Sequence, residues 1–430
     1  MTQPMTQTPS HSSAHSSAHS SAQLRSPARK SSPLVIIFTT VLVDLIGFGM
    51  VIPLIGLYGR HYGAAGMQLS ILGGIYSLMQ FFFAPIWGSL SDRVGRRPIL
   101  ILSLAGSTLS YVIFAMAPNY TWLLAARAFG GIFAANISTA QAYIADITTP
   151  ADRAKGMGLL GAAFGIGFTL GPPLGGIASA QLGLAAPGWI AAAICGCNGV
   201  LSLFRLPESL PVASRSGARE PLSLSSLFHV TQLRQALQRP DQRVLLLTFF
   251  LVTFAFSTME QTFSLLFQTK FGFDTGEAGY RTGLVLMVAG LVGAFMQGGL
   301  IRKLVPQYGE KRLLLTGLLL SSGVMALFPW LPMYSLYFLL VLPMAIGSSL
   351  INPTLSALIS KSANAREQGS TLGLSQGLGS LARAFGPFCG LLTFAITPEI
   401  PYVISGTIYL LLFLICTQGI VNQGFPKLNS

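Results

Sequence analysis

The sequence predicts an all-α integral membrane protein, with twelve transmembrane helices in two parallel six-helix bundles behind a disordered N-terminal tail. Of its 430 residues, 51% are hydrophobic and 9% are charged, and the mean hydropathy is +0.62. A soluble protein of this length needs far less apolar surface. Two further observations support this fold class: the number of long apolar runs, and motifs that recur at about half the chain length.

Residues 1–32 form the predicted tail, which is rich in serine and histidine and has no apolar face to bury. His-Ser-Ser-Ala occurs three times in succession between His11 and Ala22. Such composition is typical of disorder. A metal site made by these histidines is a weaker alternative, so we expect no metal and no cofactor.

Twelve apolar runs follow, each near the length of about 20 residues that a helix needs to cross roughly 30 Å of hydrocarbon. They divide six and six around a polar linker at 206–242, in which leucines beside Arg234 and Arg239 predict an interfacial amphipathic helix. The expected parts are therefore an N-terminal bundle (33–205), the linker (206–242), a C-terminal bundle (243–421) and a tail (422–430). The runs lie near 34–58, 67–89, 98–117, 121–146, 156–180, 187–205, 244–268, 280–301, 313–332, 335–360, 369–396 and 402–421.

The basic residues predict the orientation of these spans. With this assignment, 21 of the 26 lysines and arginines lie on the side of the N-terminus, and Arg60, Lys270 and Arg281 lie on the other side. Cytoplasmic loops carry such an excess, so both termini are expected in the cytoplasm and the protein in the cytoplasmic (inner) membrane. The net charge of +13 is then explained by loops, and no nucleic-acid partner is expected.

The two halves repeat each other. Gly171-Pro172-x-x-Gly175 in the fifth span recurs at Gly386-Pro387 in the eleventh, and the intramembrane acid Asp44 in the first span is matched by Glu260 in the seventh. The offsets between these matches are nearly equal and close to half the chain length, which indicates a six-helix unit duplicated in parallel.

Proton coupling is the function expected of Asp44, Arg127 and Glu260. Asp44 lies about 15 Å into the first span, and a charge at that depth costs several kcal/mol unless it is partnered, solvated or protonated. A fixed positive charge at Arg127 favours release of a proton by a nearby carboxyl. The alternatives are a packing hydrogen bond for Asp44, an interfacial position for Glu260 and a snorkelling side chain for Arg127. Arg383 also lies inside a span, but the sequence assigns it no function.

Two further motifs combine glycine with charge or proline. The charged stretch 88–97 separates spans two and three as a turn, and contains Gly88, Asp92, Arg93, Gly95, Arg96 and Arg97. The fifth span contains Gly158, Gly167, Gly171, Pro172, Gly175 and Gly176. Glycines four apart form one smooth stripe on which another helix packs closely, and the proline bends the helix beside it.

Together these motifs resemble the major facilitator superfamily, and within it the twelve-span drug:proton antiporters that include the tetracycline exporters. The resemblance covers about 33–421 and includes the acidic first span, the string around Arg127 in span four, and the glycine-proline string of span five. It implies alternating access to a cavity between the two bundles, with inward proton flow driving export. It also implies a cytoplasmic gate in which Asp92 latches against the start of span eleven and Arg96 meets Asp146.

The sequence departs from this pattern in the second half. Arg302 stands where the counterpart of Asp92 is expected, Gly309 follows Gly298 by eleven residues instead of seven, and Gly56 replaces a proline often seen in the first span. We therefore expect an asymmetric latch.

The leading hypothesis is a secondary active transporter that exports a small amphipathic compound or drug by proton antiport. A facilitator or proton symporter for a metabolite such as a sugar or amino acid is the alternative. An enzyme is not expected, because all five histidines lie outside the spans and no nucleophile and base are suitably spaced. The expected partners are protons, a small-molecule substrate and the lipid bilayer, and the chain is expected to be a monomer. Candidate cavity residues, which could equally join helices, are Tyr76, Gln80, Asn136, Gln141, Gln261, Asn352 and Gln376.

Overall fold

All twelve expected spans are helical in the computed structural model, which describes residues 33–134, 136–148, 153–211, 234, 236–363 and 368–422. The predicted disorder of the tail and most of the linker with its amphipathic helix lie outside these residues. The helices are α1 (Pro33–Val51), α2 (Ile55–His61), α3 (Met67–Val94), α4 (Arg96–Ala115), α5 (Tyr120–Phe133), α6 (Asn136–Ile147), α7 (Arg153–Leu182), α8 (Ala186–Arg205), α11 (Pro240–Phe271), α12 (Thr275–Phe295), α13 (Ile301–Leu327), α14 (Leu336–Ser362), α15 (Gln368–Phe394) and α16 (Ile400–Asn422). Short 3₁₀ or π segments, η1 (Ile52–Leu54), η3 (Met296–Leu300) and η4 (Phe328–Trp330), join or end some of them.

Nine helices in the described part of the chain are long and apolar enough to cross a membrane. One of them, Thr275–Trp330, contains the eighth and ninth predicted spans together. The fifth and eleventh predicted spans correspond to α7 and α15, which have 30 and 27 residues and include positions whose side chains are not described. The helices thus match the twelve predicted spans.

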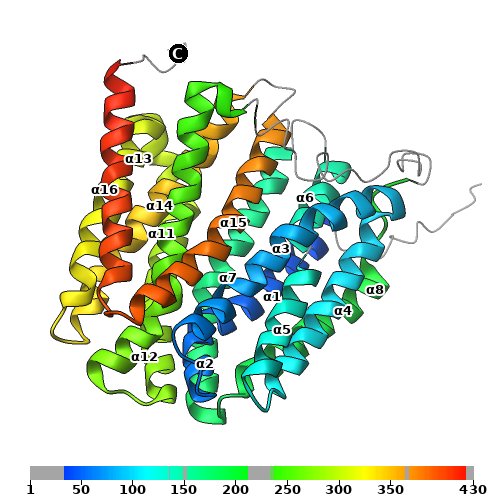
Figure 1. Ribbon diagram of the computed structural model, residues 1–430. Coiled ribbons are helices and arrows are strands. Elements are labelled where there is room, and N and C mark those ends of the chain that lie inside the picture. The colour runs from blue at the N-terminus through cyan, green and yellow to red at the C-terminus, as the bar shows by residue number, and fades with distance from the viewer. Residues whose placement is uncertain are drawn as a thin grey trace, which may run out of the picture. The chain divides into compact units, whose positions relative to one another are not determined.

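The helices of each half pack mainly with one another. In the N-terminal half (33–205), α1 packs against α7 and α8, and α4 packs against α5 and α8. In the C-terminal half (243–421), α11 packs against α15 and α16, and α13 packs against α14 and α16. Figure 1 shows α11, α13, α14 and α16 gathered together, apart from α3, α4, α5 and α8. Contact between the halves comes mostly from α7 with α12 and from α3 with α15.

The charged stretch 88–97 is not the turn that the sequence predicted. Helix α3 continues to Val94 and α4 begins at Arg96, so Gly95 alone separates them, with φ 119° and ψ 158°. A residue with a Cβ rarely adopts such a positive φ. One glycine is therefore enough to reverse the chain, and the charges of the motif lie on two helix ends.

The fourth span is also not one continuous helix. It breaks after Phe133, where Ala134 has the non-helical ψ of 51°, and resumes as α6 at Asn136. Side chains from neighbouring helices satisfy the backbone carbonyls that the break leaves without helical partners. Trp87 Nε1 donates to Ile132 O at 2.6 Å, Gln80 Nε2 donates to Ala134 O at 3.3 Å, and the Ser103 hydroxyl donates to Phe133 O.

Spans eight and nine, by contrast, are joined by helix, where the sequence predicted a loop. The helix runs through the charged stretch 302–312 and kinks at Gly309, whose φ is 73°. We call the end of the helices that carries 93–97 and 302–312 the basic end.

The opposite end, which carries Arg60, holds the hydrogen bonds that join the two halves among the described residues. Arg60 Nη1 donates to Gln268 Oε1 and to Thr269 Oγ1, both at 3.1 Å. Ser264 Oγ donates to Pro53 O at 2.5 Å. The Arg60 guanidinium also lies 5.6 Å from the centre of the Phe394 ring on α15. The first span therefore fastens to α11 and α15 at this end.

Close backbone contact between helices depends on the glycines of α7. A Cβ at Gly175 would lie 2.1 Å from Met50 O on α1, and one at Gly171 would lie 2.8 Å from the Gly49 backbone. On its other side, a Cβ at Gly176 would lie 2.5 Å from Gly279 O on α12. Helix α7 is thus in backbone contact with one helix of each half, as expected of a small-residue stripe.

Replacing Gly175 with alanine should destabilise the protein by about 1–3 kcal/mol, because α1 must shift to make room for the methyl group. The measurement is the apparent Tm of the purified protein in detergent. The matched control is Gly165→Ala on the same helix, where the nearest atom is Gln297 Oε1 at 3.8 Å and a gain in helix propensity is expected. Equal melting temperatures for the two variants would contradict this packing argument.

Candidate functional site

Three helices of the N-terminal half bring an acid, a phenol and an arginine together. The Arg127 guanidinium of α5 lies 4.5 Å from the centre of the Tyr76 ring of α3. Phe48, one turn after Asp44 on α1, has its ring centre 5.1 Å from that of Tyr76. Tyr76 is within electrostatic range of both Asp44 and Arg127. Tyr76 therefore links Asp44 and Arg127, two of the three charged residues that the sequence predicted for proton coupling.

Polar atoms of Asn136, beside Asp44, and of Arg127 are incompletely bonded among the described residues. The Asn136 amide of α6 lies beside the Asp44 carboxylate, although neither polar atom of that amide makes a hydrogen bond of normal geometry with the described residues. Arg127 is 5% exposed and its Nε is also without a partner among them. Buried polar atoms are nearly always satisfied, so the Asn136 amide and Arg127 Nε keep capacity for a further hydrogen bond, as Tyr58, Thr282 and Ser321 do elsewhere among the described residues.

The C-terminal half adds a second acid and a second arginine. Glu260 of α11 and Arg383 of α15 are within electrostatic range of each other, and Arg383 is also in range of Tyr76. Gln261 is 3% exposed, its Oε1 has no partner in the described chain, and it approaches Gly73 of α3. We call Asp44, Tyr76, Arg127, Glu260 and Arg383 the central cluster. Sequence reasoning named four of its members and gave no role to Arg383.

The remaining predicted cavity residues lie elsewhere on the same helices. Gln80 supports the break in span four through its bond to Ala134 O. Gln141 of α6 is half-buried, whereas Asn352 of α14 and Gln376 of α15 are exposed. The structure therefore brings Tyr76, Asn136 and Gln261 close to the charged residues and leaves the other four as predictions.

At the basic end, Arg96 joins the two acids that the resemblance assigned to a gate. Its Nη1 lies 2.5 Å from Asp92 Oδ1, and its Nε donates to Asp146 Oδ2 at 3.1 Å. Nη1 also donates to Ser91 Oγ at 2.6 Å, and the residue is 8% exposed. The ends of α3, α4 and α6 are thus tied together. The predicted latch partner, the start of span eleven near residue 369, belongs to the stretch 364–370 whose side chains the structure does not describe.

Glu208 is a part of this arrangement that sequence reasoning missed. Its Oε1 accepts a hydrogen bond from Arg96 N at 2.8 Å, and its Oε2 accepts one from Arg97 N at 3.3 Å. A carboxylate is favourable at a helix N-terminus because the first N–H groups have no partner inside the helix. Glu208 therefore caps α4 from the chain that leaves α8. A lone acid after the sixth span was the only sequence signal.

The C-terminal half has a corresponding pair with the charges exchanged. Gly309, with its positive φ, is the counterpart of Gly95 in the repeat, and the next residue is Glu310 in place of Arg96. Glu310 makes a salt bridge with Lys361, which stands in the repeat where Asp146 stands in the first half. In each half a glycine at the end of one span is followed by a charged residue that pairs with the end of another span. Comparison of Arg302 with Asp92 missed this pair, because four extra residues, about one helical turn, separate Gly298 from Gly309.

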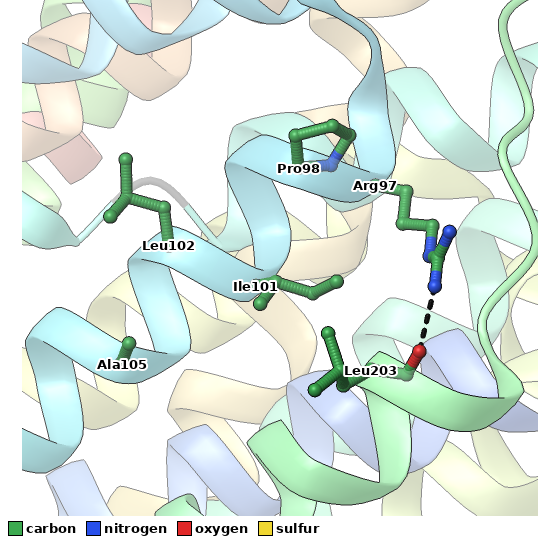
Figure 2. Close-up of a pocket in the computed structure, with 6 residues that line it drawn as sticks. All are labelled: Arg97, Pro98, Ile101, Leu102, Ala105 and Leu203. Atoms are coloured by element: carbon green, nitrogen blue, oxygen red, sulfur yellow. Dashed lines mark hydrogen bonds between the residues drawn. The ribbon is translucent and has the colours of Figure 1, made fainter.

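A surface depression of about 450 Å³ lies between α4 and α8 at the basic end (Figure 2). It is lined by Arg97, Pro98, Ile101, Leu102, Ala105 and Leu203. The Arg97 side chain donates from Nη2 to Leu203 O at 2.7 Å, as the dashed line shows. The depression contains no residue of the central cluster, so it is not the candidate transport site.

Comparisons with known proteins agree with this architecture. A model of the Major Facilitator Superfamily matches residues 37–387. The class C tetracycline resistance protein of Escherichia coli is 30% identical over 94% of this chain and 100% of its own length. Multidrug resistance protein 2 of Bacillus subtilis is 31% identical over 86% of this chain and 91% of its own. The crystal structure of the human organic anion transporter MFSD10 has 27% identity and a TM-score of 0.69, and the match covers 91% of this chain and 100% of that one.

Reversing the charges of the Glu310–Lys361 pair should test its role. Glu310→Lys and Lys361→Glu each place like charges together and should reduce transport, whereas the double exchange restores the attraction and should restore transport. Transport in right-side-out and inside-out vesicles is the measurement. Equal loss in the double variant and in the single variants would show that the pair does not act as a unit.

The same pair predicts a pH dependence. The hydrogen bond from Lys361 lowers the pKa of Glu310, which lies in the charged stretch 302–312 between the eighth and ninth predicted spans. A carboxyl with a lowered pKa stays ionised at neutral pH, and its contribution is lost as the pH falls through that pKa. Acidification below the usual range of glutamate, and not alkalinisation, should therefore increase hydrogen exchange at this end of α13. Hydrogen exchange measured on the Glu310→Gln variant should show no such step with pH.

Asp92→Asn tests the gate in the N-terminal half. It removes the charge that faces Arg96 Nη1 but leaves the Arg96–Asp146 contact in place. We expect reduced transport with normal expression and folding, as judged by flux assays and size-exclusion chromatography. Normal transport by this variant would remove Asp92 from the gate.

Proposed function

The chain belongs to the major facilitator superfamily, and we propose that it works there as a proton-coupled exporter of a small amphipathic compound or drug. Family membership makes it a membrane-embedded, multi-pass transporter of small molecules and not an enzyme. The proposal adds the coupling ion, the direction and the kind of cargo.

The observation that carries the proposal is the position of Asp44. Its carboxyl is enclosed by the helices of the N-terminal half and remains partly accessible, and it lies in the central cluster with Tyr76 and Arg127. A carboxyl inside a membrane protein that is neither hydrogen-bonded to the backbone nor locked in an ion pair can gain and lose a proton. This is the property that a proton-coupled carrier requires.

A route from Asp44 to the movement of the two halves follows from packing. Asp44 begins the α1 segment whose residues 45–50 touch the glycines of α7, and α7 touches α12 of the other half through Gly176. A change of charge at Asp44 that alters how α1 lies on α7 therefore also affects the contact between the halves. Such coupling needs two alternative arrangements of the halves, which alternating access supplies.

The proposed orientation places the basic end in the cytoplasm, with both termini there and the protein in the cytoplasmic (inner) membrane as a monomer. The excess of lysine and arginine at the basic end supports it. In that orientation, the hydrogen bonds from Arg60 and Ser264 that join the halves lie on the outer side. The structure would then correspond to a state closed toward the outside.

The charges of the central cluster bear on the cargo. Two acids and two arginines are formally neutral together when both acids are ionised. A neutral or weakly cationic compound can compete with protons for the acids, as antiport requires. The tetracycline and multidrug resistance proteins among the relatives are consistent with cargo of this kind.

The second candidate function is that of a facilitator or proton symporter. The two enclosed arginines, Arg127 and Arg383, favour it for an anionic cargo. The human relative is by name an organic anion transporter. Protonation of the acids leaves the arginines uncompensated, so anion and proton binding would strengthen each other. Ligands that bind together travel together, which is symport. The cargo's charge therefore separates the two candidate functions.

Inside-out vesicles with an acidified interior and a fluorescent pH indicator test the proposal. The probes are tetracycline, a panel of lipophilic drugs, and sugars, amino acids and organic anions as metabolites. We expect at least one lipophilic drug to dissipate the gradient with the wild type and to have no effect with Asp44→Asn. Glu399→Gln, which changes an acid outside the central cluster, should behave like the wild type.

Three outcomes would decide against the proposal. Coupled transport at the wild-type rate by Asp44→Asn would remove this carboxyl from the mechanism. Substrate movement without proton flux would identify a facilitator, and movement of proton and substrate in the same direction would identify a symporter.

A further inference from the structure

Arg97, at the start of α4, makes no salt bridge with any acid that the structure describes. Its neighbour Arg96 is paired with Asp92 and Asp146. Glu208 accepts hydrogen bonds from the backbone N–H groups that begin α4 and not from the Arg97 side chain. The charge of Arg97 is therefore left in excess within the described part of this end of the molecule.

The Arg97 guanidinium also has hydrogen-bonding capacity that the described residues do not use. Its Nη2 donates to Leu203 O at 2.7 Å, which is the only hydrogen bond that this side chain makes with them. Its Nε is shielded from water and has no partner among them. A guanidinium has five N–H donors in a planar fork, which suits a phosphate group. The side chain thus keeps donors as well as charge for an anion.

The depression shown in Figure 2 extends from this guanidinium along α4. Except for Arg97, the side chains that line it are apolar, and four of them recur at helical spacing on one face of α4 while the fifth comes from α8. They are Pro98, Ile101, Leu102, Ala105 and Leu203. Between residues 98 and 105 the helix rises by about 10 Å. A cation at one end of an apolar groove of this length suits an amphipathic anion.

The groove opens on the outer surface of helices that can cross a membrane. Both α4 and α8 are long and apolar enough to do so. Leu102 is 44% exposed, Leu203 is 46% exposed and the adjacent Phe204 is 77% exposed. Apolar side chains that are exposed on a membrane span have lipid as their neighbour. An acyl chain is therefore the occupant that fits the walls of this groove.

We propose that an anionic phospholipid binds between α4 and α8, with its phosphate on the Arg97 guanidinium and an acyl chain along the groove. Lysine and arginine are in excess at the basic end, and basic pockets between spans on the cytoplasmic side suit anionic headgroups. A zwitterionic headgroup would bring a second cation close to Arg97, which is unfavourable. The site lies apart from the central cluster, and the inference does not depend on the cargo.

A lipid at this site would act on the contacts of the basic end. Arg97 already joins the start of α4 to the end of α8 through Leu203 O. Arg96, the next residue, joins the ends of α3 and α6 through Asp92 and Asp146. A phosphate that neutralises Arg97 would reduce its repulsion of Arg96 and strengthen the attachment of these helix ends.

Native mass spectrometry of the full-length protein in detergent tests this proposal. The probes are phosphatidylglycerol and phosphatidylcholine with the same acyl chains. We expect phosphatidylglycerol to bind about tenfold more tightly, because its headgroup has no cation. Arg97→Gln should abolish this preference. Arg205→Gln, at an exposed arginine of the same end of α8 that does not line the groove, should keep it.

Ala105→Trp tests the apolar part of the groove without changing a charge. Ala105 is exposed, so a larger side chain there occupies the groove without entering the core of the fold. We expect phosphatidylglycerol to bind several-fold more weakly to this variant. Size-exclusion chromatography checks that each variant is folded. Unchanged phosphatidylglycerol binding in Arg97→Gln or in Ala105→Trp would overturn the proposal, as would equal binding of the two lipids by the wild type.

A photoreactive amino acid at position 102, in protein reconstituted into phosphatidylglycerol vesicles, identifies the occupant directly. We expect cross-links to the phospholipid. Cross-links to residues 212–233 of the linker, or to a second copy of the chain, would overturn the proposal. Inorganic phosphate, which has no acyl chain, should not displace the bound lipid at millimolar concentration. Displacement by inorganic phosphate would identify a site for a free anion instead.

Discussion

Charges enclosed by apolar helices have to balance one another, and this constraint governs the centre of the molecule. Only 9% of the residues are charged, yet two acids and two arginines lie inside the spans, on α1, α5, α11 and α15. Each of these groups alone would be costly in hydrocarbon. Tyr76 of α3 places its ring against the Arg127 guanidinium and lies within electrostatic range of Asp44 and Arg383. Both halves therefore contribute charged residues to the central cluster.

The glycines of α7 place this cluster in mechanical contact with the rest of the fold. Without Cβ atoms at Gly171, Gly175 and Gly176, the backbone of α7 touches both α1 and α12. Close backbone contact holds the segment after Asp44 near the boundary between the halves. Arg60 and Ser264 add hydrogen bonds across that boundary, at the end of the helices opposite the basic end.

The basic end shows how a duplicated unit can keep an interaction while changing its residues. Arg96 with Asp146 in one half and Glu310 with Lys361 in the other are attractive pairs at equivalent positions, with the signs exchanged. Exchange of both partners preserves the Coulomb attraction, whereas exchange of one would make it repulsive. A motif search finds the first pair and misses the second because such a search compares residue types instead of interactions.

The number of spans, the fold class and the family resemblance could all be predicted from the sequence, because a membrane span is a local property that about 20 apolar residues determine. Sequence also placed Asp44, Arg127 and Glu260 inside the spans.

The sequence could not predict that the 88–97 stretch is almost entirely helical, or that span four breaks at Ala134, since side chains from other helices satisfy the broken backbone. Tertiary structure alone decided which charged groups meet: Glu208 with the start of α4, and Glu310 with Lys361. The partners in each case belong to different spans or to the chain between them, and no periodicity or local motif connects them. Only the packing of the helices brings them within electrostatic range.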